Sequence, residues 1–383
     1  MIFRSIPLAA LASFLLALLP TPQCHCSPVP PISLQDFRPL LQEIADFSPD
    51  PCGPPYGQER NWHSAEVENP FFEQAANFVA QELNAVLPET MSPQDRTADA
   101  LKKLERLSAE INSSWPDENR FHFQILDLPP ALVMKITIRT HARYFVFGVP
   151  EESSGKPNRL WQQVGSDDVS LEHESPRSWL AIYPLHRGRS GNARFLAEFG
   201  YTGCAGSRGV VYDAREWNPQ ALGSLEQVVK QEGAFGLDDK VPGFTPIGRV
   251  RTEGALITLP YCWFSSIDTW DNPSLCAVDT YDTSGDNIKF HSRAYNRPDL
   301  VPIAKAIEYA TQRDYPAVLS YCASGEVAHK MVRDLPPIVF AEDLRVTRAG
   351  KGRERVAFGY QPAYRFNVEK HAGRWLVVAF RAD

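Results

Sequence analysis

Residues 131–149 read ALVMKITIRTHARYFVFGV, and this stretch decides how the middle of the chain folds. From Met134 to Arg139, apolar and polar side chains take alternate positions. An alternation of period two is typical of a β-strand, because successive side chains of a strand point to opposite faces of the sheet. The stretch therefore predicts strands, and the patterns on either side of it indicate where the β region begins and ends.

The strand-like pattern continues to about residue 297. The segments that carry it are short, rich in aromatic or β-branched residues, and bounded by Gly, Pro, Asn and Asp; examples are SWLAIYPL (178–185), ARFLAEFGY (193–201) and GVVYDAREW (209–217). Many short strands at roughly regular spacing are typical of an antiparallel sandwich, barrel or partial propeller. We therefore expect an antiparallel β domain over residues 119–297, with these architectures left open.

The sequence before residue 119 predicts a signal peptide followed by a helical region. Arg4, an apolar run over 6–19 and a turn-prone stretch ending at Cys26 have the layout of a secretory signal peptide over residues 1–26. We expect cleavage after Cys26, and hence a secreted or periplasmic protein without a membrane span; an uncleaved anchor is the alternative. Apolar residues at helical spacing predict a helical region over residues 27–118.

Export changes how the cysteines are interpreted, because paired cysteines persist as disulfides in oxidising compartments. Of the seven cysteines, Cys24 and Cys26 lie in the segment expected to be removed, so five remain. Cys262 and Cys276 are separated by a predicted strand–turn–strand, and we expect them to form a disulfide across that hairpin. Because five is odd, at least one thiol is left over or the expected cleavage site is wrong.

The pattern changes again after residue 297. Helical spacing is followed by short strands that end in YRFNVEKHAGRWLVVAF (364–380). Together with the turn ATQRDYPAVLSYC (310–322), this order resembles the cone-shaped α+β fold of the nuclear transport factor two-like superfamily. The resemblance covers residues 298–383 and implies a pocket-forming domain. The pocket linings that it implies are Tyr309, Tyr321, Tyr364 and Arg365. The superfamily includes both enzymes and plain binding modules, so no activity follows from it.

The segment DTWDNPSLCAVDTYDTSGD (268–286) holds five aspartates in nineteen residues. We favour a structural interpretation, because aspartate is a common turn residue. A calcium site is a second interpretation: oxygens of Asp282, Ser284 and Asp286 occur at alternate positions and could converge on a hard cation. The EF-hand pattern nevertheless fails, since no bidentate glutamate follows.

A third interpretation of the same segment is catalytic. A glycosidase needs two carboxylates flanking a sugar bond, and aromatic residues commonly lie near them. The candidate carboxylates are Asp268, Asp271, Asp279 and Asp282. Their aromatic neighbours in the sequence are Trp263, Trp270 and Tyr281, although tryptophans in a strand-rich region more often belong to the core.

Other motifs narrow the choice of function. Glycines surround Cys204 in GYTGCAGSRG (200–209), which is typical of a turn and only weakly indicates a nucleophilic cysteine. The sequence contains no HExxH, GxSxG or P-loop pattern. A net charge of −7 argues against nucleic acid or an anionic membrane as a partner.

We therefore expect an exported α+β protein with a helical N-terminal region, a central antiparallel β domain and a small C-terminal cone. The leading hypothesis is a non-catalytic binding or interaction module for a small molecule, glycan or protein, without a cofactor. The alternative is an envelope or extracellular hydrolase of a glycan-type substrate that uses the stretch from Asp268 to Asp286, with calcium as its optional cofactor.

Overall fold

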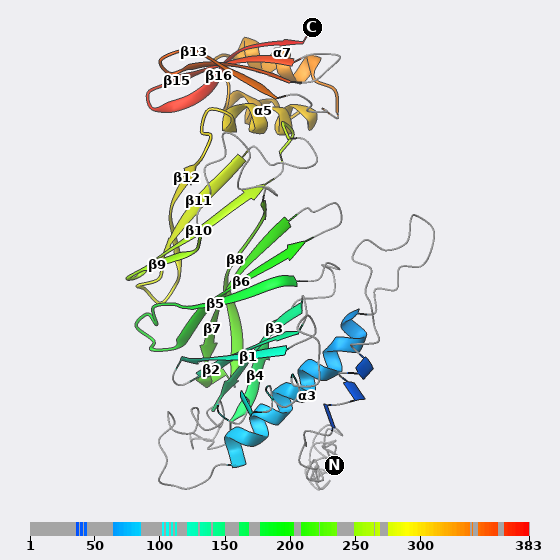
Figure 1. The fold of residues 1–383 in the computed structure, drawn as a ribbon. Coiled ribbons are helices and arrows are strands. Elements are labelled where there is room, and N and C mark those ends of the chain that lie inside the picture. Colours follow the sequence, from blue (N-terminus) through cyan, green and yellow to red (C-terminus); the bar gives the residue numbers. More distant parts are fainter. Residues whose placement is uncertain are drawn as a thin grey trace, which may run out of the picture.

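The protein is built mainly of antiparallel β-sheets, with few helices (Figure 1). The computed structural model describes residues 64–85, 121–128, 131–138, 141–149, 161–167, 177–202, 208–221, 223–235, 249–263, 265–268, 275–337, 344–358 and 364–382, together with residue 339 and single positions within 36–43 and 102–112. Helix α3 and the first sheet lie at one end of an elongated molecule, and the last sheet with its helices lies at the other (Figure 1).

The first sheet has four strands in the order β1-β2-β3-β4, and each neighbouring pair is antiparallel. Its strands are β1 (Phe121–Leu128), β2 (Ala131–Ile138), β3 (His141–Gly148) and β4 (Gln162–Ser166). The stretch 131–149 thus forms strands, as its alternation predicts, and the structure shows that these are the antiparallel neighbours β2 and β3. Met134 and Ile136 pack toward α3 (Ser64–Ala85), whereas Val133 packs toward the second sheet, so β2 is buried on both faces.

The second sheet has eight strands, ordered β12-β11-β10-β8-β7-β6-β5 with β9 paired to β10. Its strands are β5 (Arg177–Pro184), β6 (Ala193–Thr202), β7 (Arg208–Asn218), β8 (Ser224–Phe235), β9 (Arg251–Glu253), β10 (Leu256–Trp263), β11 (Leu275–Asp282) and β12 (Lys289–Tyr295), and η4 (Pro219–Ala221) is a short 3₁₀ turn. In the register, β10 meets β8 only at the pair Cys262 and Ala234. Strands β9 to β12 therefore form a lobe that leads toward the C-terminal unit (Figure 1).

The C-terminal unit consists of three helices followed by a four-stranded antiparallel sheet. The helices are α5 (Val301–Thr311), α6 (Tyr315–Leu319) and α7 (Gly325–Asp334); the strands are β13 (Arg345–Gly350), β14 (Arg353–Phe358), β15 (Tyr364–His371) and β16 (Arg374–Ala382). Asp314 and Ser324 cap α6 and α7, each accepting a backbone N–H bond through its side chain. Helices followed by a meander are the order that the sequence predicts for this segment.

Four apolar clusters hold these layers together. One lies between α3 and the first sheet, a second between the first sheet and strands β5 to β7, and a third between strands β5 to β8 and strands β10 to β12. The fourth packs α5, α6 and α7 against β14 to β16 and also includes Ile267 and Leu275. Because these two residues precede α5 in the chain, the β lobe and the C-terminal unit share one core.

The expected helical region over residues 27–118 is not supported as a whole. Within it the structure describes one continuous helix, α3, whose buried side chains include Phe71, Phe72 and Val79. Helical spacing alone stabilises a helix poorly in water, and α3 has a sheet on which to bury its apolar face. Elsewhere in this region only single helical positions within 36–43 and 102–112 are described.

The disulfide between Cys262 and Cys276 is confirmed. The two residues lie directly opposite each other on β10 and β11, and both are buried. Among the described cysteines, Cys322 is free and buried, and burial raises the pKa of its thiol to about 12. Cys52 and Cys204 lie outside the described residues. In the part of the chain that the structure covers, no helix is both long and apolar enough to cross a membrane.

Candidate functional site

A cavity of about 560 Å³ lies where the β lobe meets the C-terminal unit. Ligand pockets commonly have volumes of ~300–1,000 Å³ and often occur between domains. One wall comes from β8, β10, β11 and β12, and the other from the segment that leads into α5, from α5 itself, from the residue Tyr321 that follows α6, and from the β15–β16 turn. The two walls are far apart in the sequence, so only the packing of the two units creates the cavity.

Five aromatic rings line the cavity: Tyr261, Trp263, Tyr295, Tyr321 and Trp375. On the β lobe the rings are in mutual contact, since the centroids of Tyr261 and Trp263 lie 5.9 Å apart, as do those of Trp263 and Tyr295. Except for the buried Tyr261, these side chains are only partly buried. Aromatic rings left in contact with water inside a cavity offer flat apolar surfaces to a ligand.

The disulfide orients part of this aromatic wall. Successive residues of a strand point to opposite faces, so Tyr261 and Trp263 share the face opposite to that of Cys262. Trp263 is paired with Leu275, which also lines the cavity, and the Cys262–Cys276 pair comes next in the register. The covalent bond therefore fixes the register of the two strands directly beside the cavity.

Three cationic side chains line the cavity: Arg293 on β12, Lys305 on α5 and Arg374 on β16. Arg293 lies opposite Asp279 and donates to its carboxylate through Nε at 2.6 Å and through Nη2 at 2.7 Å. Asp279 is fully buried and also accepts from the hydroxyl of Tyr261 at 3.2 Å. Asp279 thus acts as a positioning residue beneath the wall, because it holds Arg293 and Tyr261 together.

The C-terminal wall is shaped by a tight turn. His371 and Arg374 pair across the two-residue turn Ala372-Gly373, in which both residues have positive φ (48° and 86°). Such a turn matches the twist of a β-hairpin, and glycine adopts the second position without strain. The turn places Gly373, Arg374 and Trp375 on the lining of the cavity.

Arg374 and Tyr321 form the part of this wall next to the turn. Arg374 donates through Nη2 to the carbonyl of Ser320 at 2.7 Å, and its guanidinium lies 5.9 Å from the ring centroid of Tyr321. The Tyr321 ring is stacked on Tyr309, with the centroids 6.0 Å apart.

The four residues expected to line a pocket in the C-terminal domain have different places. Tyr321 lines the cavity, and Tyr309 supports it from behind. Tyr364 is buried in the core against Phe358, and Arg365 is exposed on the next position of β15. Neither of these two lines the cavity, because the space between the helices and the sheet is filled by apolar side chains.

The candidate catalytic carboxylates are engaged in separate contacts. Asp268 caps its own turn by accepting from the backbone N–H and the hydroxyl of Ser265, at 2.6 and 2.7 Å. Asp279 is buried beneath Arg293, whereas Asp282 is half-buried and accepts from the backbone N–H of Ser284 at 2.8 Å. Hydrogen bonds from the side chain and the backbone N–H of Ser284 hold the pKa of Asp282 below its usual value. Asp271 and Trp270 lie outside the described residues.

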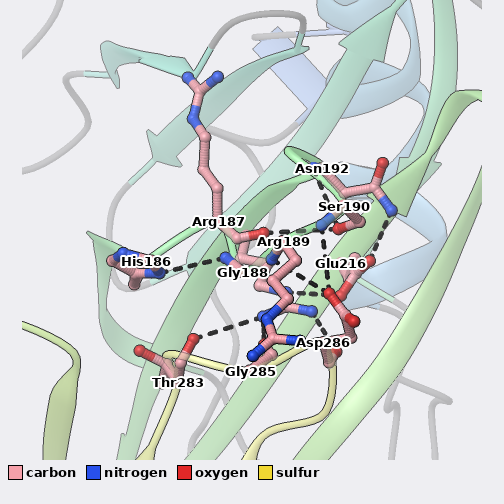
Figure 2. Close-up of polar contacts among 11 residues, drawn as sticks. His186, Arg187, Gly188, Arg189, Ser190, Asn192, Glu216, Thr283, Gly285 and Asp286 are labelled. Atoms are coloured by element: carbon pink, nitrogen blue, oxygen red, sulfur yellow. Dashed lines mark hydrogen bonds and ion pairs between the residues drawn. The ribbon is translucent and has the colours of Figure 1, made fainter.

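The proposed calcium ligands lie on one turn that is held by arginine and backbone groups. Asp286 accepts through Oδ1 from the backbone N–H groups of Arg189 and Ser190, at 3.0 and 3.2 Å (Figure 2). The buried guanidinium of Arg194 donates to the carbonyls of Gly285 (2.7 Å) and Asp286. Because Arg194 is also ion-paired with Glu216, it ties the carbonyls of this turn to strand β7 (Figure 2).

No group of three or more His, Cys, Asp or Glu side chains arranged to hold a metal occurs among the described residues. The side-chain oxygens of Asp282 and Asp286 are directed to different backbone donors. The calcium site at Asp282, Ser284 and Asp286 therefore stays a prediction, because the described side chains are not arranged as a set of calcium ligands.

Several residues of the cavity escape prediction from sequence. Arg293, Lys305, Arg374 and Trp375 carry no motif, and they come from three elements separated by helices and turns. The one local signal is the alternation in the segment YCW, which places Tyr261 and Trp263 on the same face of a strand.

No family model matches this chain, and no curated protein matches it.

Proposed function

We propose that the protein is an exported, non-catalytic binding module whose ligand occupies the cavity between the β lobe and the C-terminal unit. The observation that carries the proposal is the lining itself: five aromatic rings, four of them only partly buried, converge from two parts of the chain that are far apart in the sequence. Convergent aromatic and polar groups in a cavity of this volume are typical of small-molecule sites.

Export is supported by two features. The first 26 residues have the layout of a signal peptide, and the buried Cys262–Cys276 disulfide is a bond that persists outside the cytosol. We further propose that residues 298–383 form a cone-like α+β unit of the nuclear transport factor two-like kind. Its interior is filled by residues such as Phe358 and Phe366, so the ligand would bind at the rim of this unit.

The alternative of a glycan hydrolase needs two carboxyl groups that face each other across the substrate. Asp268, Asp279 and Asp282 are bound to a serine, an arginine and a backbone N–H group respectively. The lining of the cavity contains no Asp or Glu among the described residues. These contacts favour binding over bond cleavage.

The first prediction tests the cavity by truncating Trp375. A thermal-shift screen of the mature protein against sugars, sugar acids and aromatic acids would identify ligands, and calorimetry would measure their Kd. We expect Trp375→Ala to weaken binding at least about tenfold, because it removes a partly buried ring from the lining.

The matched control is Leu256→Ala, which truncates a residue 39% exposed at the opposite end of β10 from Trp263. This variant should bind as the unchanged protein does. Circular dichroism would establish that both variants are folded. Ligands that bind Trp375→Ala with unchanged Kd would contradict the proposal, and release of sugar products from a polysaccharide would favour the hydrolase.

A further inference from the structure

We infer that the cavity takes a sugar acid, a pyranose ring that carries a carboxylate. This inference rests on the proposed binding function and names the ligand class of the same cavity. It follows from three properties of the lining: the sign of its charge, the chemistry of its rings and the position of α5.

The charge of the lining is opposite to that of the whole chain. Arg293, Lys305 and Arg374 line the cavity, and no carboxylate does so among the described lining residues, although the chain has a net charge of −7. Such a concentration of cations selects an anion, because water is partly excluded from a cavity and its charges are less screened there.

The three cations differ in how far they are already neutralised. Arg293 forms a bidentate pair with the buried Asp279, and Lys305 pairs with Glu308 at 2.7 Å. The described contacts of Arg374 are the carbonyl of Ser320 and the ring of Tyr321, and neither is an anion. A guanidinium has five N–H donors, so Arg374 retains donors for a ligand carboxylate. The excess positive charge is therefore centred at the β15–β16 turn.

Helix α5 adds to the same field. Val301 and Pro302, the first two residues of α5, line the cavity. The N-terminus of a helix carries a partial positive charge, which stabilises a nearby anion. Pro302 has no backbone N–H, so this helix end contributes charge more than hydrogen bonds.

The aromatic rings indicate what carries the anion. Trp263 and Tyr295 on one wall, and Tyr321 and Trp375 on the other, present partly buried rings to the cavity. A pyranose has a face of C–H groups that packs on such rings, and its hydroxyl groups can bond to tyrosine hydroxyls, which both donate and accept. A bare inorganic anion would leave this apolar surface unused.

The experiment compares three ligands with the mature protein: a trimer of galacturonic acid, the same trimer with its carboxylates converted to methyl esters, and benzoate. The ester keeps the rings and removes the charge. We expect the acid trimer to bind at least about tenfold more tightly than the ester, with an affinity that falls as salt is added, and benzoate to bind more weakly than the acid trimer.

Arg374→Gln should weaken binding of the acid trimer at least about tenfold and leave the ester unchanged. The control is Arg353→Gln, which removes an exposed arginine that pairs with Glu369 and does not line the cavity. Equal affinities for acid and ester, equal losses of both in Arg374→Gln, tighter binding of benzoate, or no binding of the acid trimer at millimolar concentration would each overturn the inference.

These outcomes are separable from failure of the proposed function. If Trp375→Ala weakens binding of any ligand while acid and ester bind alike, the cavity is a binding site and the ligand class is wrong. If the acid trimer binds Trp375→Ala and Arg374→Gln as tightly as the unchanged protein, both the cavity and its ligand class are wrong.

Discussion

At the scale of single residues, the fold depends on close contacts between layers. Trp217 on β7 is fully buried between the first and second sheets and packs over the backbone of Gly148 at the end of β3. A Cβ atom added at Gly148 would lie 2.5 Å from Cζ2 of the Trp217 ring. Glycine is thus required here by the approach of another layer.

Replacing Gly148 by alanine should therefore destabilise the protein. The methyl group would displace the Trp217 ring in a packed core, which costs about 1–3 kcal/mol of the free energy of unfolding. Urea unfolding would measure the loss. Gly285→Ala is the matched control, because its new Cβ would meet nothing closer than 3.5 Å. Equal stabilities of the two variants would show that the two sheets are not packed as described.

At the scale of elements, the hairpin of β10 and β11 connects the fold with the cavity. Its disulfide is flanked by Tyr261 and Trp263 on one strand and by Leu275 and Ala277 on the other. The pairing was predictable, since two cysteines on adjacent strands of an expected hairpin can lie opposite each other. The use of the opposite face as a cavity wall was not predictable, because it depends on where α5 and the β15–β16 turn pack.

Removing this disulfide should lower stability and disturb the cavity together. The bond joins residues 14 positions apart, and closing a loop of that length stabilises a protein by about 3 kcal/mol. We expect the double variant Cys262→Ala/Cys276→Ala to lose roughly this free energy of unfolding. It should also bind ligand more weakly, because no covalent bond then holds β10 and β11 in register beside Trp263.

Treatment of both proteins with a reductant is the control for this prediction. Dithiothreitol should destabilise the unchanged protein by a similar amount and have little effect on the double variant. Free Cys322 cannot mimic the effect, since it is buried and its thiol pKa is raised by burial to about 12. A double variant as stable as the unchanged protein would contradict the role given to the bond.

At the scale of the whole molecule, local sequence patterns predict individual strands, whereas the cavity depends on packing between segments that are far apart in the sequence. Alternation at Met134 and Ile136 predicts β2, because both faces of that strand are set by period two. Helical spacing before residue 119 predicts a helical region, of which the structure describes the helix α3 and single helical positions within 36–43 and 102–112. Of the cavity lining, the sequence predicts Tyr321 but not its cations, since Arg293, Lys305 and Arg374 meet only where the two units pack together.

The segment between those two units also carries a titratable contact. Between β12 and α5, Arg297 holds Asp299 through two hydrogen bonds, at 2.6 and 3.1 Å, and lies 3.6 Å from Glu354 on β14. Oε2 of Glu354 is buried and receives no hydrogen bond from an ordinary donor among the described residues, so Glu354 and Asp299 can bond only when one of the two carboxyl groups holds a proton. A hydrogen bond with Asp299, burial and the charge of Asp299 together raise the pKa of Glu354 to about 7. Glu354 therefore binds its proton more tightly in the folded protein than in the unfolded chain.

This raised pKa predicts that stability falls as pH rises. The stabilisation from protonated Glu354 is complete below the ordinary glutamate pKa of ~4.5 and is lost as pH passes through about 7. Between pH 5 and pH 8 we expect a loss of stability on the order of 1 kcal/mol, because water screens this partly exposed group.

Glu354→Gln, which keeps a donor toward Asp299, should show a flatter profile of Tm against pH. Glu308→Gln, which removes a more exposed carboxylate on α5, should keep the slope of the unchanged protein. If Glu354→Gln retains that slope as well, the contact between Glu354 and Asp299 is not the cause of the pH dependence of stability.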